Sequence, residues 1–302
     1  MSIKVEHISK NYGEQKALND VSFSLAKGEI CGFLGPNGAG KSTMMKIITG
    51  YLSEFEGEAF VDGVDVRKDP IAAKRLIGYL PEHNPIYPEM YIREYLEYVA
   101  RLYKIKNVSK KVGEVIAATG LQPEINKKIG QLSKGYRQRV GLAQALVHDP
   151  EVLILDEPMT GLDPNQLEEI RNLIVEVGRN KTVMLSTHIM QEVEAICNRV
   201  IIIDKGNVVA DKPKGAFQRE SKGLFIQVRF ATDTDEDWLN QIEGVESVRR
   251  MAPALFYITS KQGADPRVAL FHAAAGNASP IIELKTEDQN LEGLFRDLTL
   301  HP

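Results

Sequence analysis

The chain has few cysteines and no excess of either charge. Its 302 residues include only two cysteines, Cys31 and Cys197, and their wide separation fits neither a CxxC motif nor a metal-ligand pair. We therefore expect two buried free thiols in a reducing compartment rather than a disulfide. The 37 basic and 41 acidic residues leave a net charge of −4, which gives no general attraction to nucleic acid.

Signals for membrane insertion and secretion are lacking as well. No stretch approaches the ~20 consecutive apolar residues of a membrane helix, and the first ten residues are charged where a signal peptide would be apolar. We expect a protein that stays in the cytoplasm. With 43% hydrophobic and 26% charged residues, the composition is typical of a globular protein, and the length suffices for two domains of ~150 residues each.

Short apolar segments alternate with longer amphipathic segments from Ile3 to about Lys212. This alternation predicts an α/β domain over residues 1–216, with a largely parallel sheet and crossover helices. The clearest buried strands are the segments 29–34, 152–155 and 182–186. A helical subdomain is predicted at about 88–147, where a tyrosine stripe is more typical of a core or a partner surface than of a cofactor site.

A second, smaller unit is predicted beyond a boundary near Phe217, over residues 217–302. Its order of strand, helix, strand, strand, helix and strand is that of a small ferredoxin-like α+β layer. The predicted strands are 224–230, 245–250, 255–259 and 281–285, and the predicted helices are 236–242, 266–275 and 291–298. Nothing in this unit indicates catalysis.

A glycine-rich motif lies between a predicted strand and a predicted helix. It comprises Gly35, Pro36, Asn37, Gly38, Ala39, Gly40, Lys41, Ser42 and Thr43. The spacing is that of a phosphate-binding loop, in which glycines let backbone N–H groups wrap the phosphates of ATP. Lys41 is expected to reach the β- and γ-phosphates, and Ser42 to offer its hydroxyl to Mg²⁺. The alternative is a glycine-rich turn before an ordinary helix, and Lys41 and Ser42 in register argue against it.

Two carboxylates follow the apolar segment 152–155, at the sheet edge where α/β proteins bind ligands. Asp156 is expected to hold Mg²⁺ through its water shell, and Glu157 to act as the general base on the attacking water. His188 closes the strand 182–186 at the same edge, where it can stabilise the transferring phosphoryl group. The alternatives are a strand that ends in an ordinary charged loop and a histidine with only structural hydrogen bonds.

These features describe many NTPases, and one more segment narrows the class. Residues 132–138 read Leu-Ser-Lys-Gly-Tyr-Arg-Gln and resemble the signature sequence of ATP-binding cassette (ABC) proteins. Ser133 can cap a helix here, and Gly135 permits close approach of the backbone to a phosphate. The resemblance implies a P-loop NTPase that hydrolyses ATP with Mg²⁺. It also implies two cassettes packed head to tail, with Ser133 and Gly135 of one completing the ATP site of the other.

The resemblance covers about residues 3–212. Tyr12 lies where the family stacks an aromatic ring on adenine, and His188 resembles its switch histidine. Gly161, Leu162 and Asp163 resemble the loop that crosses the dimer interface.

Three residues depart from the family pattern. Glu82 falls where the family usually has a glutamine that senses Mg²⁺ and contacts the membrane partner. A carboxylate there would bind Mg²⁺ more strongly or repel Glu157, so Glu82 is a candidate metal ligand whose role differs from that of glutamine. The commonest form of the signature is Leu-Ser-Gly-Gly-Gln. This chain has Lys134 in place of its first glycine and Tyr136 in place of its glutamine.

The segment 78–82, Gly-Tyr-Leu-Pro-Glu, and the appended unit resemble the ATPase subunits of type-2 ABC exporters. The run 82–91 resembles the gliding-motility-associated ABC transporter ATP-binding subunit of the Bacteroidetes. The resemblance implies an export-type subunit at the cytoplasmic face of the inner membrane, linked to gliding motility, that dimerises around ATP and moves a separate membrane permease. The permease is expected to dock at Glu82 and along the face from Tyr91 to Tyr98.

Two other functions fit parts of the sequence. A regulatory switch, whose ATP-dependent dimer signals to a partner without transport, would use the same motifs, and an adjacent permease gene would favour transport. A soluble ABC protein acting on DNA or ribosomes usually needs a long coiled coil or two cassettes in one chain, and this sequence has neither.

Overall fold

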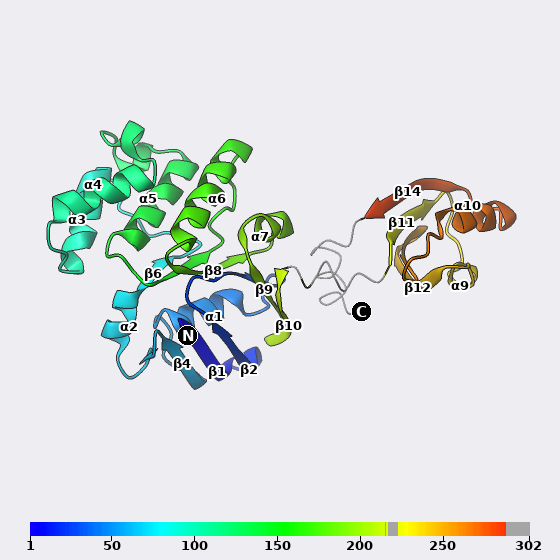
Figure 1. Cartoon of the computed structure of the whole chain (residues 1–302), viewed down its shortest axis with the longest axis horizontal. Coiled ribbons are helices and arrows are strands. Elements are labelled where there is room, and N and C mark those ends of the chain that lie inside the picture. The colour runs from blue at the N-terminus through cyan, green and yellow to red at the C-terminus, as the bar shows by residue number, and fades with distance from the viewer. Residues whose placement is uncertain (215, 217–222, 288–302) are drawn as a thin grey trace. The chain divides into compact units, whose positions relative to one another are not determined.

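The computed structural model describes residues 1–214, 216 and 223–287, and contacts divide the chain into two units, Met1–Lys214 and Gly215–Pro302 (Figure 1). Each unit has its own hydrophobic core. The predicted boundary near Phe217 and the predicted helix 291–298 lie outside the described residues. No helix in the described ranges is long and apolar enough to cross a membrane.

A six-stranded sheet forms the centre of the first unit, in the order β10-β9-β3-β8-β7-β6. Its strands are β3 (Ile30–Leu34), β6 (Ile77–Leu80), β7 (Val152–Asp156), β8 (Thr182–Thr187), β9 (Arg199–Asp204) and β10 (Asn207–Pro213). All of them run parallel except β10, which pairs antiparallel with β9. Strands β3, β7 and β8 are buried at every position, as their unbroken apolar runs predict. Strand β10 lacks such a run, and its residues alternate between exposed and half-buried.

The N-terminal strands correct the expectation of one largely parallel sheet. A separate antiparallel sheet, in the order β2-β1-β4-β5, is built from β1 (Ile3–Tyr12), β2 (Gln15–Leu25), β4 (Glu56–Val61) and β5 (Val64–Asp65). Strand β1 buries alternate residues such as Ile3 and Val5, a period that belongs to a sheet with one covered face. Gly13, at φ 59°, lies in the short turn that joins β1 directly to β2, and such a turn can only connect antiparallel strands.

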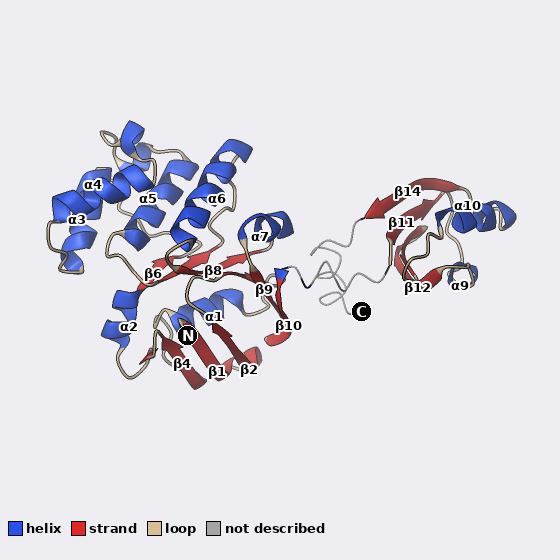
Figure 2. Ribbon diagram, in the orientation of Figure 1, coloured by secondary structure: helices blue, strands red, loops and turns tan. Residues whose placement is uncertain are grey.

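Helices cover both faces of the six-stranded sheet (Figure 2). Helix α1 (Lys41–Ile48) lies between the two sheets, and its apolar residues belong to the core that both sheets share. Helices α5 (Lys134–Leu146), α6 (Pro164–Gly178) and α7 (Met190–Ile196) lie on the opposite face. Helix α2 (Pro70–Leu76) precedes β6. The central strands are therefore shielded from water on both sides.

The predicted helical subdomain contains α3 (Ile92–Leu102), α4 (Val108–Ala118) and α5, with two short 3₁₀ turns, Gln122–Glu124 and Ile129–Gln131, between α4 and α5. The tyrosine stripe of α3 divides between inside and outside. Tyr95 is buried, whereas Tyr91 and Tyr98 are 48% and 42% exposed. One side of the stripe is core, and the other is available surface.

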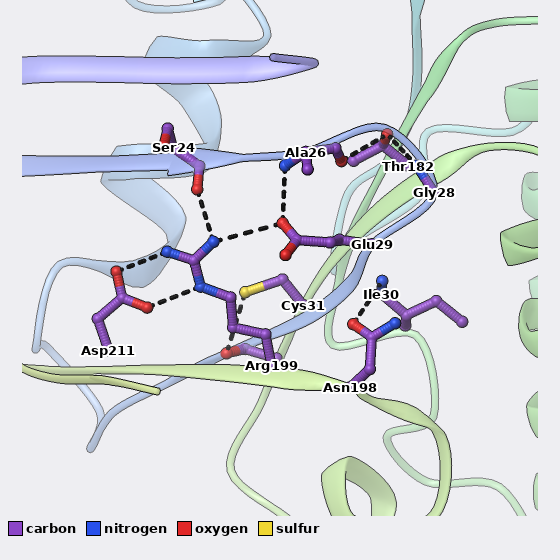
Figure 3. Close-up of polar contacts among 11 residues, drawn as sticks. Ser24, Ala26, Gly28, Glu29, Ile30, Cys31, Thr182, Asn198, Arg199 and Asp211 are labelled. Atoms are coloured by element: carbon purple, nitrogen blue, oxygen red, sulfur yellow. Dashed lines mark hydrogen bonds and ion pairs between the residues drawn. The ribbon is translucent and has the colours of Figure 1, made fainter. Parts of the chain in front are cut away.

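One guanidinium joins the amino ends of β3 and β9 to β2 and β10 (Figure 3). Arg199 donates to both carboxylate oxygens of Asp211 at 2.7 and 2.8 Å and to the backbone oxygen of Ser24 at 2.8 Å. It also donates to Glu29 at 3.3 Å. The hydrogen bonds with Asp211 raise the pKa of Arg199. This network fixes β10, the last strand of the first unit.

The two cysteines are buried free thiols, as predicted, and they lie on opposite faces of β3. Cys31 belongs to the core beneath the antiparallel sheet. Cys197 contacts the other face, where its Sγ lies 3.2 Å from the position that a Cβ on Gly32 would occupy. Burial raises the pKa of Cys31 well above its usual value and that of Cys197 to about 12.

The second unit is a four-stranded antiparallel sheet in the order β12-β13-β11-β14. Its elements are β11 (Phe225–Phe230), α9 (Asp237–Asn240), β12 (Val245–Ala252), β13 (Leu255–Ser260), α10 (Arg267–Gly276) and β14 (Ile281–Glu287). The succession and the strand order match the ferredoxin-like arrangement predicted from the sequence. Trp238 packs edge-on against Phe230 at 5.7 Å, as a core anchor would.

Candidate nucleotide site

The glycine-rich loop connects the carboxyl end of β3 to the amino end of α1. Gly40 caps the helix at φ 109°, where a side chain would be strained and its Cβ would lie 2.5 Å from the backbone oxygen of Ala17. The Nζ of Lys41 donates to the backbone oxygens of Gly35 at 2.7 Å and Pro36 at 3.2 Å. The loop is thus a curved cradle with an amine at its floor. Burial lowers the pKa of Lys41, while the nearby carboxylates of Glu157, Asp156 and Glu82 act in the opposite direction.

A cleft of about 530 Å³ opens over this loop. Of the residues predicted for the site, it is lined by Tyr12, Asn37, Gly38, Gly40, Lys41, Ser42, Thr43, Glu82, Glu157 and His188. Tyr12 is 49% exposed, and the Nζ of Lys10 lies 5.2 Å from the centre of its ring. The cleft therefore combines an aromatic platform, a phosphate cradle and carboxylates, which together suit a nucleoside triphosphate.

Asp156 ends strand β7 at the bottom of the site and is only 3% exposed. Its Oδ1 accepts a hydrogen bond from the Oγ of Ser186 at 2.6 Å and one from the Oγ of Ser42 at 3.4 Å. A hydroxyl and a carboxylate oxygen facing one another are hard oxygen donors of the kind that Mg²⁺ prefers. These two residues fit a Mg²⁺ ion bound together with the phosphates.

Glu157 adopts a backbone conformation that side chains rarely take, with φ at 51°. Its Oε2 lies 2.9 Å from the Nδ1 of His188 and accepts a hydrogen bond from the Oγ of Thr160 at 2.9 Å. The carboxylate is 10% exposed, against 53% for the His188 side chain. The strained turn thus directs an almost buried carboxylate toward the histidine at the rim of the cleft.

Glu82 follows β6 and lines the cleft with its carboxylate exposed. It also lines a second cavity of about 640 Å³, as does Ser42. This cavity is further lined by Lys46, Lys74, Tyr79, Tyr103, Asp156 and His148. Four members of this wall were not predicted from the sequence: Lys46, Lys74, Tyr103 and His148. They come from α1, from α2, from the end of α3 and from the loop after α5, and they share no motif.

The signature residues lie elsewhere. Ser133 caps α5 by accepting a hydrogen bond from the backbone N–H of Tyr136 at 3.3 Å, as predicted. Neither Ser133 nor Gly135 lines the cleft over the glycine-rich loop of its own chain. Gly135 also has a local role, since a Cβ there would lie 2.5 Å from the Oε1 of Gln166. Most of the other candidates line this one cleft, and Gly35, Pro36 and Ala39 lie in the loop itself. Asp156 lines the second cavity instead and accepts a hydrogen bond from Ser42, which lines both.

Two hydroxyl residues, Thr160 and Ser186, were also missed. They contact the two acids directly, but nothing in the sequence distinguishes them from other serines and threonines near strand ends. Only the pairing of β7 with β8 brings Ser186 opposite Asp156.

The profile of the ABC transporter family matches residues 18–160. The chain is 40% identical over 198 residues to the ABC transporter ATP-binding protein NatA of Bacillus subtilis (strain 168). The aligned region covers 64% of this chain and 80% of NatA. It is 31% identical over 304 residues to the linearmycin resistance ATP-binding protein LnrL of the same strain, with 98% of each chain covered. It is 36% identical over 217 residues to the Nod factor export ATP-binding protein I of Rhizobium meliloti (strain 1021), covering 70% of this chain and 64% of that protein.

Among solved structures, the chain is similar to the dimeric, post-hydrolysis state of the ATP-binding cassette MJ0796 bound to ADP and Pi. The TM-score is 0.64 at 27% identity, over 70% of this chain and 98% of that chain. The shared part is the P-loop NTPase fold of an ABC cassette.

The chain belongs to the ATP-binding subunits of ABC transporters. It is an ABC ATPase, and its cofactors are ATP and Mg²⁺.

Proposed function

We propose that this chain hydrolyses ATP with Lys41, Ser42, Asp156, Glu157 and His188 and thereby drives export through a separate membrane permease. The observation that carries the proposal is the position of Glu157. Its carboxylate is almost buried, lies 2.9 Å from His188, and shares one cleft with the glycine-rich loop. This combination suits a general base that acts beside a γ-phosphate.

Each of these residues has a separate role in ATP hydrolysis. Lys41 exchanges the carbonyl oxygens of its loop for phosphate oxygens, and Glu157 takes the proton from the attacking water. His188 donates toward the transferring group, and Ser42 and Asp156 would hold Mg²⁺. Bound Mg²⁺ supplies charge neutralisation on the phosphate oxygens. Glu82 would add a third carboxylate near the ion, in place of the glutamine usual in the family.

A second cassette would complete the site. Ser133 and Gly135 do not line their own cleft, and the similar cassette MJ0796 forms a dimer in the state bound to ADP and Pi. We propose that these residues contact the ATP bound by a partner cassette. Closure on ATP and release after hydrolysis would then provide the mechanical stroke.

The permease would dock on the helical subdomain, at the cytoplasmic face of the inner membrane. Two features support this: the exposed Tyr91 and Tyr98 at the start of α3 and within it, and the second cavity, whose wall includes Tyr103 and Gln144 of the subdomain. Ser42 and Glu82 line both cavities, so a change at the nucleotide can be sensed at the partner's side. Export is supported by the similarity to the Nod factor export protein. Gliding motility is a narrower proposal, which rests on the segment 82–91 alone.

The accessory unit, residues 217–302, is proposed to be dispensable for nucleotide binding, because among the described residues all those that line the cleft precede it. A chain truncated at the boundary should bind ATP as tightly as the full chain. Folding without ATP binding would mean that the unit supports the site.

The decisive experiment is Glu157→Gln, which keeps the shape of the side chain but removes the base. Hydrolysis should fall by roughly 10²–10⁴-fold while ATP still binds. Removing a negative charge beside the γ-phosphate should also favour the ATP dimer. Light scattering should therefore show a monomer with ADP and a dimer with ATP, and adding Ser133→Arg should abolish the dimer. A Glu157→Gln protein that hydrolyses ATP at the wild-type rate would refute the proposed role of Glu157.

A further inference from the structure

Two hydroxyl groups hold the two acids of the site. Both acids end or follow β7, but the hydroxyls come from different elements: Ser186 from β8, and Thr160 from the turn before α6. Neither is among the site residues predicted from the sequence. Their hydrogen bonds differ in kind, and the difference suggests a separate task for each.

Ser186 is fully buried and forms bonds in both directions. Its Oγ donates to the Oδ1 of Asp156 at 2.6 Å and accepts from the backbone N–H of Glu157 at 3.0 Å. Since a hydroxyl has one proton, accepting from Glu157 leaves that proton for Asp156. The serine therefore fixes the orientation of one acid and the strained backbone of the next.

Thr160 acts on the carboxylate of Glu157. Its Oγ donates to Oε2 at 2.9 Å, the same oxygen that faces His188. Within the described part of the chain, the bonds to this carboxylate all end on Oε2. Oε1 is therefore the oxygen left to accept a proton from water. The rotamer that presents Oε1 depends on the interactions of Oε2 with Thr160 and His188.

We propose that Thr160 and Ser186 are positioning residues for the hydrolysis, Thr160 presenting the Oε1 of Glu157 to water and Ser186 presenting Asp156 to Mg²⁺. The inference rests on the proposed role of Glu157 as the base. It assigns two separable effects, one on the rate of the chemical step and one on the Mg²⁺ requirement.

For Thr160, the test is Thr160→Val, which keeps the volume and removes the hydroxyl. The kcat for ATP should fall ~10-fold, as expected for one hydrogen bond to a charged group, while KM changes less than about twofold. Thr160→Ser, which keeps the hydroxyl, should restore kcat. The matched control is Thr119→Val, which removes a buried hydroxyl bonded at 2.8 Å to the backbone oxygen of Val115 in the helical subdomain, and should leave kcat unchanged.

For Ser186, the test is Ser186→Ala in a Mg²⁺ titration of the ATPase. The concentration for half-maximal activity should rise by ~10-fold, since groups that orient a metal ligand typically contribute that much to affinity. Ser260→Ala is the matched control. Ser260 is a fully buried strand serine that also accepts from a backbone N–H, that of Leu224 at 2.7 Å, and lies in the second unit. Its loss should leave the titration unchanged, and thermal unfolding checks that each variant is folded.

The two proposals fail in different ways. If Glu157→Gln is inactive but Thr160→Val and Ser186→Ala keep wild-type kcat and Mg²⁺ dependence, the positioning roles are wrong and the base stands. If Thr160→Val raises KM and leaves kcat intact, Thr160 is a nucleotide contact and the proposal is overturned. In the Glu157→Gln background, Thr160→Val should lower the residual rate no further, because the residue acts through Glu157.

Discussion

The two ends of the parallel sheet hold charged side chains in opposite ways. At the amino ends, Arg199 donates to Asp211, Glu29 and a backbone oxygen, so its guanidinium is engaged on three sides (Figure 3). At the carboxyl ends, the amine of Lys41 bonds to two carbonyl oxygens of its own loop, and the bonds to Glu157 end on a single oxygen. A charge that is paired within the chain stabilises the fold, whereas one with bonding capacity left over is available to a ligand.

The largest effect should follow from Lys41→Ala. Turnover should fall by at least ~10²-fold, because the amine that neutralises the phosphates is lost. The free energy of unfolding should stay the same or rise, since the variant removes a charge whose pKa burial already lowers. ATPase assays and thermal unfolding measure the two effects. Lys46→Ala, on the exposed side of α1, is the control. Near-normal turnover by a folded Lys41→Ala protein would mean that the amine of Lys41 does not act on the bound nucleotide.

Arg199→Met should show the reverse pattern. Removing a half-buried guanidinium leaves Asp211 and Glu29 without their partner and should cost ~2–3 kcal/mol of folding free energy. The kcat of the protein that remains folded should be unchanged. Denaturant unfolding gives the first quantity and ATPase activity the second. Arg267→Met breaks an exposed pair with Asp265 and should change stability little. Equal losses in the two variants would contradict the role of the network.

His148 sharpens the comparison, because it is a half-buried base in the wall of the second cavity. Its ring stacks on Tyr103 at 3.9 Å, its Nε2 contacts the backbone oxygen of Ile77 at 2.9 Å, and burial lowers its pKa to about 4. Above pH 6.5 the ring is neutral in both the folded and unfolded states. As the pH falls from 6.5 toward 4, His148 binds a proton in the unfolded chain but stays neutral in the folded chain. The free energy of unfolding therefore decreases.

His148→Phe keeps the stacking and removes this titration. The free energy of unfolding should therefore decline less between pH 7 and pH 4.5 than in the wild type, by ~1–2 kcal/mol after allowance for partial exposure. Urea unfolding at the two pH values measures it. His272→Phe, at an exposed histidine of α10, should leave the pH dependence as it is. Parallel curves for His148→Phe and the wild type would show that the ring is not the titrating group.

Glu82→Gln should have the smallest effect. An exposed carboxylate near the ion adds a modest attraction, so the Mg²⁺ concentration for half-maximal activity should rise by ~3-fold. The affinity for ATP should change less. An unchanged Mg²⁺ titration would mean that the side chain points away from the metal.

The sequence predicts those parts of the site that a short segment specifies by itself. The glycine-rich loop, Asp156 and Glu157 lie in short runs that directly follow apolar strands, and in the structure these strands are β3 and β7. Ser186 meets Asp156 only because β7 pairs with β8, and the Arg199 network joins residues up to 175 positions apart. Thr160 lies only three residues from Glu157, but no motif predicted from the sequence includes it. The antiparallel sheet was missed for another reason: its period-2 signal was present, but the parallel pattern around it was stronger.

The placement of the two cysteines has a practical consequence for spectroscopy. Thiol reagents react with the thiolate, and both thiols are buried with raised pKa values, on separate faces of one strand. The native chain should therefore take up almost no maleimide while folded. A cysteine introduced in place of the exposed Tyr98 would carry a fluorophore or spin label at one known place on the first unit, without first removing the native thiols. Distance measurements between two labelled copies could then follow cassette closure in an otherwise unaltered protein.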